Sequence, residues 1–378
     1  MMKPPATIGD PLSAVDTPAL LVDLDAFEAN LKTMADAIAD TGVRLRAHSK
    51  THKSPIIGLK QMAMGAVGVC CQKVSEAEIM VEGGVPDVLV SNQIVGTAKL
   101  DRLAQLNHQA RVAVCADHPN GVRQLSEAAG RARTSIDVLV EIDVGAGRCG
   151  VAPGAPAVEM AKSIAAADGL RFGGLQAYHG SAQHIRDHGE RHGTAARAVD
   201  LTRTTVALLG DAGLDCEIIG GAGSGTFQTE AQSGVYNEIQ AGSYVFMDVD
   251  YARNRDRDGG FMAQFKHALF VQATVLSEAA AGKLTLDAGH KACAIDSGPP
   301  QPFDMPGAEV MGLADEHCVI DVSQVNDRPA WGDKILLIPG HCDPTVNLHD
   351  HYVCMRGLHG PTPVVEDIWP VAARGALF

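Results

Sequence analysis

The segment RLRAHSKTHKS, residues 44–54, gathers basic side chains at the end of a predicted strand, although the whole chain carries a formal net charge of -14. Lys50 is the residue of this segment that could do chemistry, because a lysine amine becomes nucleophilic when neighbouring cations lower its pKa. His48, His52 and Lys53 are the neighbouring basic residues. A solvated turn is the competing interpretation, because lysine side chains normally lie exposed.

A glycine-rich segment, GGAGSGT at residues 220–226, could bind an anion. Glycines let the backbone approach a phosphate closely, and serine and threonine hydroxyls add hydrogen-bond donors. The segment lacks the lysine of a Walker motif, which disfavours a nucleoside triphosphate. A tight turn without a ligand is the alternative. The residues expected to bind the anion are Gly221, Gly223, Ser224, Gly225 and Thr226.

A second glycine pattern, GAGRCG at residues 145–150, formally matches the dinucleotide motif G-x-G-x-x-G. It follows the sixth predicted strand, whereas a dinucleotide fold needs it after the first strand, with an acidic residue about 20 positions further on. We therefore interpret Arg148, inside this pattern, as a contact to an anion or to a cofactor oxygen, with an exposed arginine as the alternative.

His341 and Asp343, in the segment PGHCDP at residues 339–344, could bind a divalent metal ion. On an extended segment, two side chains at this spacing point to the same face. Imidazole and carboxylate together suit a divalent ion. Only these two ligands are evident in the segment, which leaves positions for water or substrate and favours a catalytic site over a structural one.

The composition is that of a folded chain with a small molecule as partner. With 378 residues, of which 46% are hydrophobic and 20% charged, it can bury a large core and has the length of two domains. The acidic balance disfavours nucleic acid and anionic membranes. Nine cysteines without a C-x-x-C pair predict free thiols in a reducing compartment. No apolar run has the length of a membrane span and the N-terminus lacks a signal-peptide pattern, so we predict a cytoplasmic protein.

Strand and helix patterns alternate from residue 19 onward. Short apolar or β-branched runs predict eight strands, and longer segments with apolar residues every three to four positions predict helices between them. Eight such units are typical of a TIM barrel, with a doubly wound sheet as the alternative. The predicted strands are residues 19–23, 44–50, 67–72, 87–92, 111–117, 136–143, 172–180 and 216–223.

A TIM barrel carries its active site at the carboxyl ends of its strands. Lys50, Gln72 and Asn92 end the second, third and fourth predicted strands, and Tyr178 and His184 lie at the end of the seventh. The glycine-rich segment follows the eighth. A lysine that faces a phosphate-binding loop across the same mouth is the arrangement that pyridoxal phosphate requires.

After about residue 262 the pattern changes to strands broken by Gly, Pro and Asp, without a long helical run. We therefore predict an α/β fold of two domains: a cofactor-binding (β/α)8 barrel over residues 18–262 and an antiparallel β domain over residues 263–378. The Pro-rich residues 1–17 are expected to pack on the β domain, which carries the metal-binding pair.

Six segments, in chain order, carry a resemblance to a known family: RLRAHSKTHKSP, GVCCQKVSEAE, VLVEIDVGAGRCGV, LQAYHGSAQH, GVYNEIQAGSYVFMD and IPGHCDPTVNLHD. Together they resemble the D-threonine aldolases, fold-type III pyridoxal phosphate enzymes related to alanine racemase and to D-serine dehydratase. The match extends over essentially the whole chain. One departure is Ala222, at a position where close relatives carry glycine.

The resemblance implies a barrel of the alanine racemase type, a homodimer, pyridoxal 5'-phosphate, and a divalent metal, most often manganese, with magnesium, cobalt or zinc as alternatives. Lys50 matches the Schiff-base lysine, and His341 and Asp343 match the metal ligands. His184 matches a histidine near the substrate hydroxyl. The other residues then expected to contact the cofactor are Gln72, Arg148, Tyr178 and the glycine-rich segment.

The implied reaction is the retro-aldol cleavage of a D-3-hydroxy-amino acid of the D-threonine type to glycine and an aldehyde. The metal would acidify the β-hydroxyl, and His184 or a metal-bound hydroxide would take its proton. A 3-hydroxy-D-aspartate aldolase is a close alternative, and a D-serine or D-3-hydroxyaspartate dehydratase is one of another class. D-serine dehydratases typically carry cysteine at the second metal position, so Asp343 favours an aldolase. A racemase and a non-enzymatic pyridoxal phosphate carrier are further alternatives.

Overall fold

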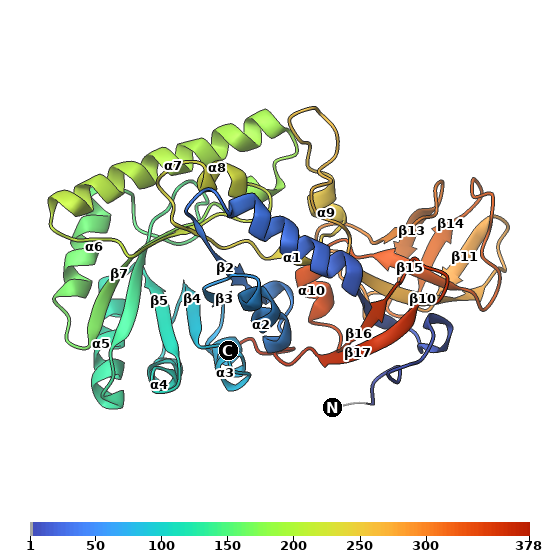
Figure 1. The fold of residues 1–378 in the computed structure, drawn as a ribbon, viewed down its shortest axis with the longest axis horizontal. Helices are drawn as coiled ribbons and strands as arrows, with labels where there is room; N and C mark the ends of the chain where they lie inside the picture. Colours follow the sequence, from blue (N-terminus) through green and yellow to red (C-terminus); the bar gives the residue numbers. More distant parts are fainter. Residues whose placement is uncertain (1–2) are drawn as a thin grey trace.

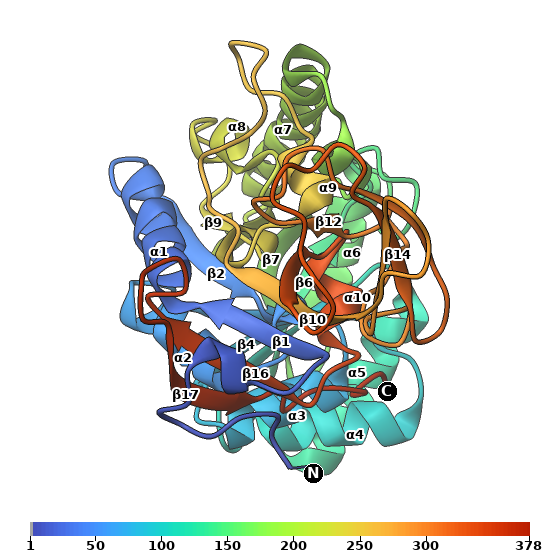
Figure 2. The same ribbon diagram turned by 90° about the vertical axis from the view of Figure 1, so that its right-hand side faces the viewer.

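The computed structural model describes residues 3–378, which form a closed barrel and a nine-stranded sheet side by side (Figure 1, Figure 2). The barrel strands are all parallel, pair in chain order and close where the last strand meets the first. They are β2 (Arg44–His48), β3 (Gly68–Cys71), β4 (Asp87–Gln93), β5 (Arg111–Ala116), β6 (Ile136–Glu141), β7 (Leu170–Ala177), β8 (Ile218–Gly221) and β9 (Glu238–Ile239). The helices between them are α2 (Pro55–Ala63), α3 (Val74–Glu82), α4 (Thr97–Leu106), α5 (Pro119–Ala132), α6 (Ala155–Ala165), α7 (His188–Asp211) and α8 (Phe227–Ala231).

The barrel strands are buried on both faces, because helices cover their outer side and side chains fill the interior. In β3, Val69 and Cys71 pack with the helices, whereas Cys70 between them belongs to the interior cluster with Leu89 and Leu139. Burial raises the pKa of the Cys70 thiol well above its usual value, so this cysteine is a small apolar filler. The predicted TIM barrel is confirmed.

The nine-stranded sheet has the order β13-β14-β11-β10-β1-β16-β17, with β15 paired to β10 and β12 paired to β15. Its described strand pairs are antiparallel except that β1 runs parallel to β16. The strands are β1 (Ala19–Asp23), β10 (Leu269–Ser277), β11 (Lys283–Leu286), β12 (Gln301–Pro302), β13 (Glu309–Leu313), β14 (Cys318–Asp321), β15 (Lys334–Ile338), β16 (His351–Arg356) and β17 (Val364–Pro370). The remaining helices are α1 (Leu24–Ile38), α9 (Val249–Ala252), α10 (Cys342–Val346) and the short 3-10 turns η1 (Leu12–Ala14), η2 (Ser49–Thr51), η3 (Ser181–His184) and η4 (Ser243–Val245).

The N-terminal segment bonds to this sheet. The N–H of Gly9 donates to the carbonyl of Val365 at 2.8 Å, and Lys334 Nζ donates to the carbonyl of Ser13 at 2.8 Å. These bonds join the start of the chain to strands β15 and β17.

One predicted barrel strand belongs to the other sheet. The prediction that residues 19–23 form a barrel strand is wrong, because β1 pairs with β10 and β16. The eighth barrel strand is instead β9, which has two residues and was not predicted. All five residues of β1 are buried, as they would be in either sheet, so the apolar run alone does not identify its partners. The glycine-rich segment therefore follows the seventh barrel strand, β8.

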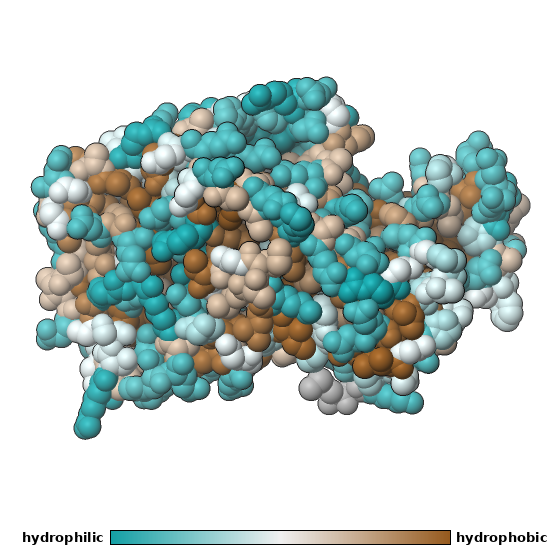
Figure 3. All heavy atoms as spheres, viewed as in Figure 1, coloured by the Kyte–Doolittle hydropathy of each residue, from teal (hydrophilic) through white to brown (hydrophobic). Residues whose placement is uncertain are grey.

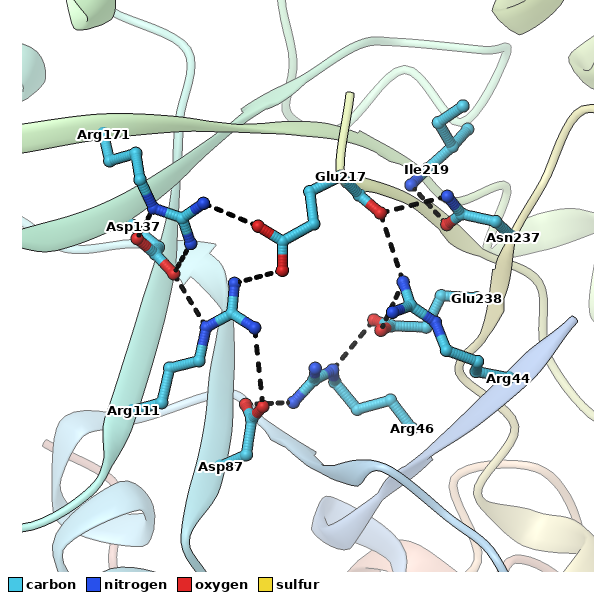
Figure 4. Close-up of polar contacts among 10 residues, drawn as sticks. All are labelled: Arg44, Arg46, Asp87, Arg111, Asp137, Arg171, Glu217, Ile219, Asn237 and Glu238. Atoms are coloured by element: carbon cyan, nitrogen blue, oxygen red, sulfur yellow. Dashed lines mark hydrogen bonds and ion pairs between the residues drawn. The ribbon is translucent and has the colours of Figure 1, made fainter. Parts of the chain in front are cut away.

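A ring of charges closes the barrel at the amino ends of its strands (Figure 4). Arg46 lies at its most buried point: Nε is 2.8 Å from Glu238 Oε1, and Nη1 is 2.6 Å from Asp87 Oδ1. Arginines and carboxylates alternate around the ring, so each carboxylate has a cationic neighbour. The charged members are Arg44, Arg46, Arg111, Arg171, Asp87, Asp137, Glu217 and Glu238.

The face of the molecule shown in Figure 3 is largely polar. Figure 3 shows a face on which hydrophilic side chains dominate, with smaller hydrophobic patches between them. Among the residues that the structure describes, no helix is both long and apolar enough to cross a membrane.

Candidate active site

A cavity of about 260 Å³ lies at the carboxyl ends of the barrel strands, where the barrel meets α10, the helix that follows strand β15 of the nine-stranded sheet. Nine of the twelve residues that the sequence predicted for the site line it. They are Lys50, Gln72, Arg148, Tyr178, His184, Gly223, Ser224, His341 and Asp343. The structure thus brings together side chains from the barrel strands and from the β15–α10 connection, which are far apart in the sequence.

Lys50 enters the cavity from η2, directly after β2. Its amine Nζ lies 3.3 Å from Asp343 Oδ2. The negative charge of Asp343 raises the pKa of Lys50, so the expectation that neighbouring cations lower this pKa is wrong.

The three basic neighbours of Lys50 do not act as cations toward it. Burial lowers the pKa of His48 well below its usual value and that of His52 to about 4, so both imidazoles are neutral near pH 7. Lys53 is buried and pairs with Glu76, with 2.5 Å between Nζ and Oε1. The basic segment therefore holds one amine in the cavity.

The glycine-rich segment divides between the cavity and the barrel wall. Gly223 and Ser224 line the cavity, and Ser224 Oγ accepts the N–H of Tyr244 at 2.9 Å, which leaves its hydroxyl hydrogen to donate. Gly221 is the last residue of β8, and a Cβ there would lie 2.4 Å from the carbonyl oxygen of Ala177. The wall thus needs a glycine at position 221 for close packing.

Gly225 and Thr226 lie on the far side of the segment and line a second cavity. The N–H of Gly225 donates to Gln183 Oε1 at 3.0 Å, and the Thr226 hydroxyl donates to Glu230 Oε1 at 2.8 Å. Ala222, between the two halves, has φ +64°, a conformation that favours glycine, the residue that the resemblance implies for this position. Gln183 and Glu230 therefore fix the shape of the segment from behind.

Eight further residues, which were not predicted for the site, also line the cavity. Ser91 lies near the end of the predicted strand 87–92, so the rule that barrel sites gather there could have found it. Gln176 is next to the last residue of β7, but the predicted strand continued to residue 180. Gly242 and Ser243 follow β9, the strand that was not predicted. The others are His48, Thr51, Gln240 and Tyr251.

The metal-binding pair adopts a different backbone from the one predicted. His341 is extended and is the N-cap of α10, whereas Asp343 lies in the first turn of that helix. His341 Nε2 and Asp343 Oδ1 nevertheless lie 3.7 Å apart. His341 Nδ1 is held by Asp296 Oδ2 at 3.0 Å and by Ser297 Oγ at 3.2 Å, which leaves Nε2 free for a ligand.

Two observations test whether this pair fits a metal ion. Asp343 Oδ1 is buried and has no hydrogen-bond partner among the described residues, as expected for an oxygen that binds a cation. The described residues hold no group of three or more His, Cys, Asp or Glu side chains around one point, so water or substrate would complete the coordination. Burial lowers the pKa of His341, but the negative charges of Asp343, Asp248 and Asp296 around the ring outweigh burial and raise this pKa to about 9.

The cavity also fits pyridoxal 5'-phosphate. The amine-bearing Lys50 lines it together with Gly223, Ser224, Gly242 and Ser243, small residues that let a phosphate approach the backbone closely. The guanidinium carbon of Arg148 lies over the ring of Tyr178, 5.8 Å from the centre of that ring. Gln72 Nε2 lies 2.9 Å from His48 Nε2 and donates to Ser91 Oγ at 3.1 Å, which fixes the floor beside Lys50.

His184 ends η3 and lines the cavity, with its ring centre 5.5 Å from that of Tyr251. Its Nδ1 lies 2.5 Å from Asp250 Oδ2. The ring nitrogen left for chemistry is therefore Nε2.

Comparison with known proteins places this geometry in a family. Residues 22–250 match the family described as alanine racemase, N-terminal domain, and residues 268–355 match a putative serine dehydratase domain. D-threonine aldolase of Arthrobacter sp. is 46% identical over 374 residues, which cover 99% of this chain and 97% of that protein. 3-Hydroxy-D-aspartate aldolase of Paracoccus denitrificans (strain Pd 1222) is 43% identical, with 98% and 95% covered.

The same relationship holds for solved structures. The crystal structure of D-threonine aldolase from Filomicrobium marinum superposes with a TM-score of 0.96 at 54% identity, with 99% of this chain and 100% of that chain covered. The predicted resemblance is confirmed, and the chain belongs to the D-threonine aldolase family, whose barrel is of the alanine racemase type.

Proposed function

We propose that this protein is a carbon–carbon lyase that cleaves D-3-hydroxy-amino acids of the D-threonine type to glycine and an aldehyde, with pyridoxal 5'-phosphate and a divalent metal ion, manganese above all. The observation that carries the proposal is the closeness of two different groups in one cavity. Lys50 Nζ lies 3.3 Å from Asp343 Oδ2, beside His341. The amine and the β-hydroxyl of the substrate sit on adjacent carbons, so groups that serve them must lie this close together.

The residues have separate tasks in this proposal. Lys50 holds the cofactor, and Gly223, Ser224, Gly242 and Ser243 hold its phosphate. When bound, pyridoxal phosphate supplies the acceptor for the electron pair released from the Cα–Cβ bond. Arg148, Tyr178 and Gln72 are the polar side chains in place to orient it.

Three residues serve the β-hydroxyl. His341 and Asp343 would hold the metal ion, whose Lewis acidity lowers the pKa of the hydroxyl. Nε2 of His184 takes the hydroxyl proton as general base, because Nδ1 is already engaged by Asp250. Loss of that proton lets the oxygen become the carbonyl of the leaving aldehyde.

Two alternatives have specific support. The 43% identity to a 3-hydroxy-D-aspartate aldolase favours the same cleavage with an acidic β-substituent. The match of residues 268–355 to a putative serine dehydratase domain favours loss of the β-hydroxyl, with a keto acid and ammonia as products.

A substrate panel tests the proposal. D-threonine, D-phenylserine, 3-hydroxy-D-aspartate and D-serine are each incubated with the purified protein, with and without manganese, and the products are identified. We expect glycine and an aldehyde from D-threonine, with manganese increasing the rate, and no products from Lys50→Ala. Keto acid and ammonia as the main products would identify a dehydratase and contradict the proposal, and cleavage restricted to 3-hydroxy-D-aspartate would correct the substrate.

A homodimer and a cytoplasmic location are further parts of this proposal. Light scattering after size-exclusion chromatography tests the dimer. The nine cysteines are all free thiols in the described part of the chain, in keeping with a reducing compartment.

A further inference from the structure

A buried carboxylate stands behind the proposed general base. Asp250, on α9, divides its two oxygens between two partners: Oδ2 lies 2.5 Å from His184 Nδ1, and Oδ1 pairs with the guanidinium of Arg186. The side chain of Asp250 is only 5% exposed, whereas that of His184 is 42% exposed and lines the cavity. The carboxylate is thus hidden from the substrate and can act on it only through His184.

The surroundings of Asp250 are rigidly connected. Arg186 also donates to the carbonyl of Asp250 at 2.5 Å and to Asn254 Oδ1 at 2.8 Å. Asn254 Nδ2 in turn donates to the carbonyl of Gln183, the residue before His184, at 2.9 Å. These bonds hold η3 and α9 together, so the imidazole has little freedom to turn away from the carboxylate.

The same short helix is tied to the metal-binding pair. The N–H of Asp250 donates to the carbonyl of Gly340 at 3.1 Å, and Gly340 precedes His341. In Figure 1 and Figure 2, α9 lies where the barrel meets the nine-stranded region. One element therefore sets the distance between the proposed base and the proposed metal ligands.

The contact fixes which ring nitrogen carries the proton. A carboxylate only accepts hydrogen bonds, so Nδ1 of neutral His184 must carry the hydrogen and Nε2 must carry the lone pair. When Nε2 takes the β-hydroxyl proton, no other proton moves: Nδ1 keeps its hydrogen, and the imidazolium gains an ionised partner. Burial alone would raise the pKa of Asp250, but its bonds to His184 and Arg186 lower this pKa to about 2, so the carboxylate stays ionised at working pH.

We propose that Asp250 is the positioning residue of the reaction: it holds His184 in the tautomer with Nε2 free, and Arg186 holds the Asp250 carboxylate in place for that task. This inference rests on the proposed function of His184 as the base for the β-hydroxyl. A purely structural ion pair between Asp250 and Arg186 is the competing explanation, and it predicts no effect on the tautomer.

Asp250→Asn tests the inference in the holoenzyme, with D-threonine and manganese. We expect kcat to fall by about 10²- to 10⁴-fold, because the amide no longer enforces the tautomer, while KM changes by less than about threefold. Asp187→Asn is the matched control: it removes the same charge three residues from His184, at a carboxylate that caps Glu190 N–H instead. We expect its kcat to stay within about twofold of wild type, because Asp187 is exposed to solvent, which screens its charge, and its carboxylate bonds to Glu190 N–H.

A spectroscopic measurement separates positioning from folding. Nitrogen-15 chemical shifts of labelled histidines report the tautomer, and the His184 signal is identified by its loss in His184→Gln. We expect the Nδ1–H tautomer in wild type, and loss of this preference in Asp250→Asn. Asp250→Glu keeps the carboxylate and should restore part of kcat and of the tautomer preference.

Several outcomes would overturn the inference. A kcat of Asp250→Asn within about tenfold of wild type would do so, as would an Nε2–H tautomer of His184 in wild type, which decides the question even if Asp250→Asn does not fold. Failure of wild type to cleave any substrate of the panel would instead overturn the proposed function, and the wild-type tautomer would still be measured independently.

Discussion

Replacing Arg46 by methionine should destabilise the barrel far more than replacing Arg171, although both arginines belong to the same ring of charges (Figure 4). The side chain of Arg46 is 3% exposed and that of its partner Glu238 is fully buried, whereas the side chain of Arg171 is 48% exposed. The two substitutions remove the same charge and leave a similar apolar stem. They differ in the carboxylates that lose a positive partner and in how deeply these carboxylates are buried.

The magnitude follows from the partners. Arg46→Met leaves the carboxylate of Glu238 buried with only Arg44 nearby, at 3.8 Å, and breaking a buried pair in this way costs about 3–5 kcal/mol. After Arg171→Met, Asp137 and Glu217 both keep Arg111, at 2.8 and 2.7 Å. The two ion pairs of the half-exposed Arg171 are lost, and because each carboxylate keeps a cationic partner we expect their loss to cost together about 0–1 kcal/mol.

Thermal unfolding followed by far-ultraviolet circular dichroism is the assay. Tryptophan fluorescence would not report on the barrel directly, because both tryptophans, Trp331 and Trp369, lie outside it. With about 2–4 °C per kcal/mol, Arg46→Met should lower Tm by about 6–20 °C and Arg171→Met by less than about 4 °C. Equal shifts for the two variants would refute the reasoning, since they would show that burial does not decide the contribution of a ring member.

Further predictions concern the site. Borohydride reduction of the holoenzyme should fix a pyridoxyl group on Lys50, and recovery of the label on another lysine would contradict its role. His341→Ala and Asp343→Ala should each weaken manganese binding and leave the cofactor absorbance unchanged. The loss of affinity should exceed about 10- to 100-fold, which is the loss when a residue that only hydrogen-bonds to a metal ligand is removed. Unchanged manganese titrations would argue against the pair. His184→Ala should lower kcat by about 10²- to 10⁴-fold, and a fall below tenfold would move the base elsewhere. Burial raises the pKa of Glu230 from its ordinary 4.5 to about 8. The stability that protonated Glu230 contributes is therefore fully present below pH 4.5 and is lost as the pH rises toward 8. Glu230→Gln should reduce the fall of Tm over this pH range, and parallel Tm curves for the variant and wild type would contradict this.

The sequence predicted the barrel well because its signal is local. Each parallel strand is a short buried run followed by an amphipathic helix, and this alternation repeats along the chain. The rule that barrel sites gather at strand ends then nominated Lys50, Gln72 and Tyr178, which line one cavity. These predictions needed no knowledge of distant contacts.

The failures have the opposite cause. Residues 19–23 were assigned to the barrel because the partners that place them in the other sheet, such as Tyr352 opposite Leu20, are far along the chain. The strand Glu238–Ile239 has two residues, too few for a periodic pattern, and with it the lining residues Gly242 and Ser243 were missed.

The electrostatics of the basic segment could not be predicted either. The sequence shows His48, His52 and Lys53 beside Lys50, but their charges depend on burial and on the contact of Lys53 with Glu76. Asp343, the residue that raises the pKa of Lys50, lies almost three hundred positions away in the sequence and only 3.3 Å away in space.

The pairing of β1 with β10 and β16 has a consequence for the order in which the molecule is assembled during translation. The barrel strands, residues 44–239, leave the ribosome while Leu20, Leu21 and Val22 still lack the neighbours on either side of them. Their hydrogen-bonding edges stay open until β16, near the end of the chain, has been made. Because open apolar edges pair with other chains, a protein shortened before β16 should aggregate through its earliest strand even if its barrel has closed.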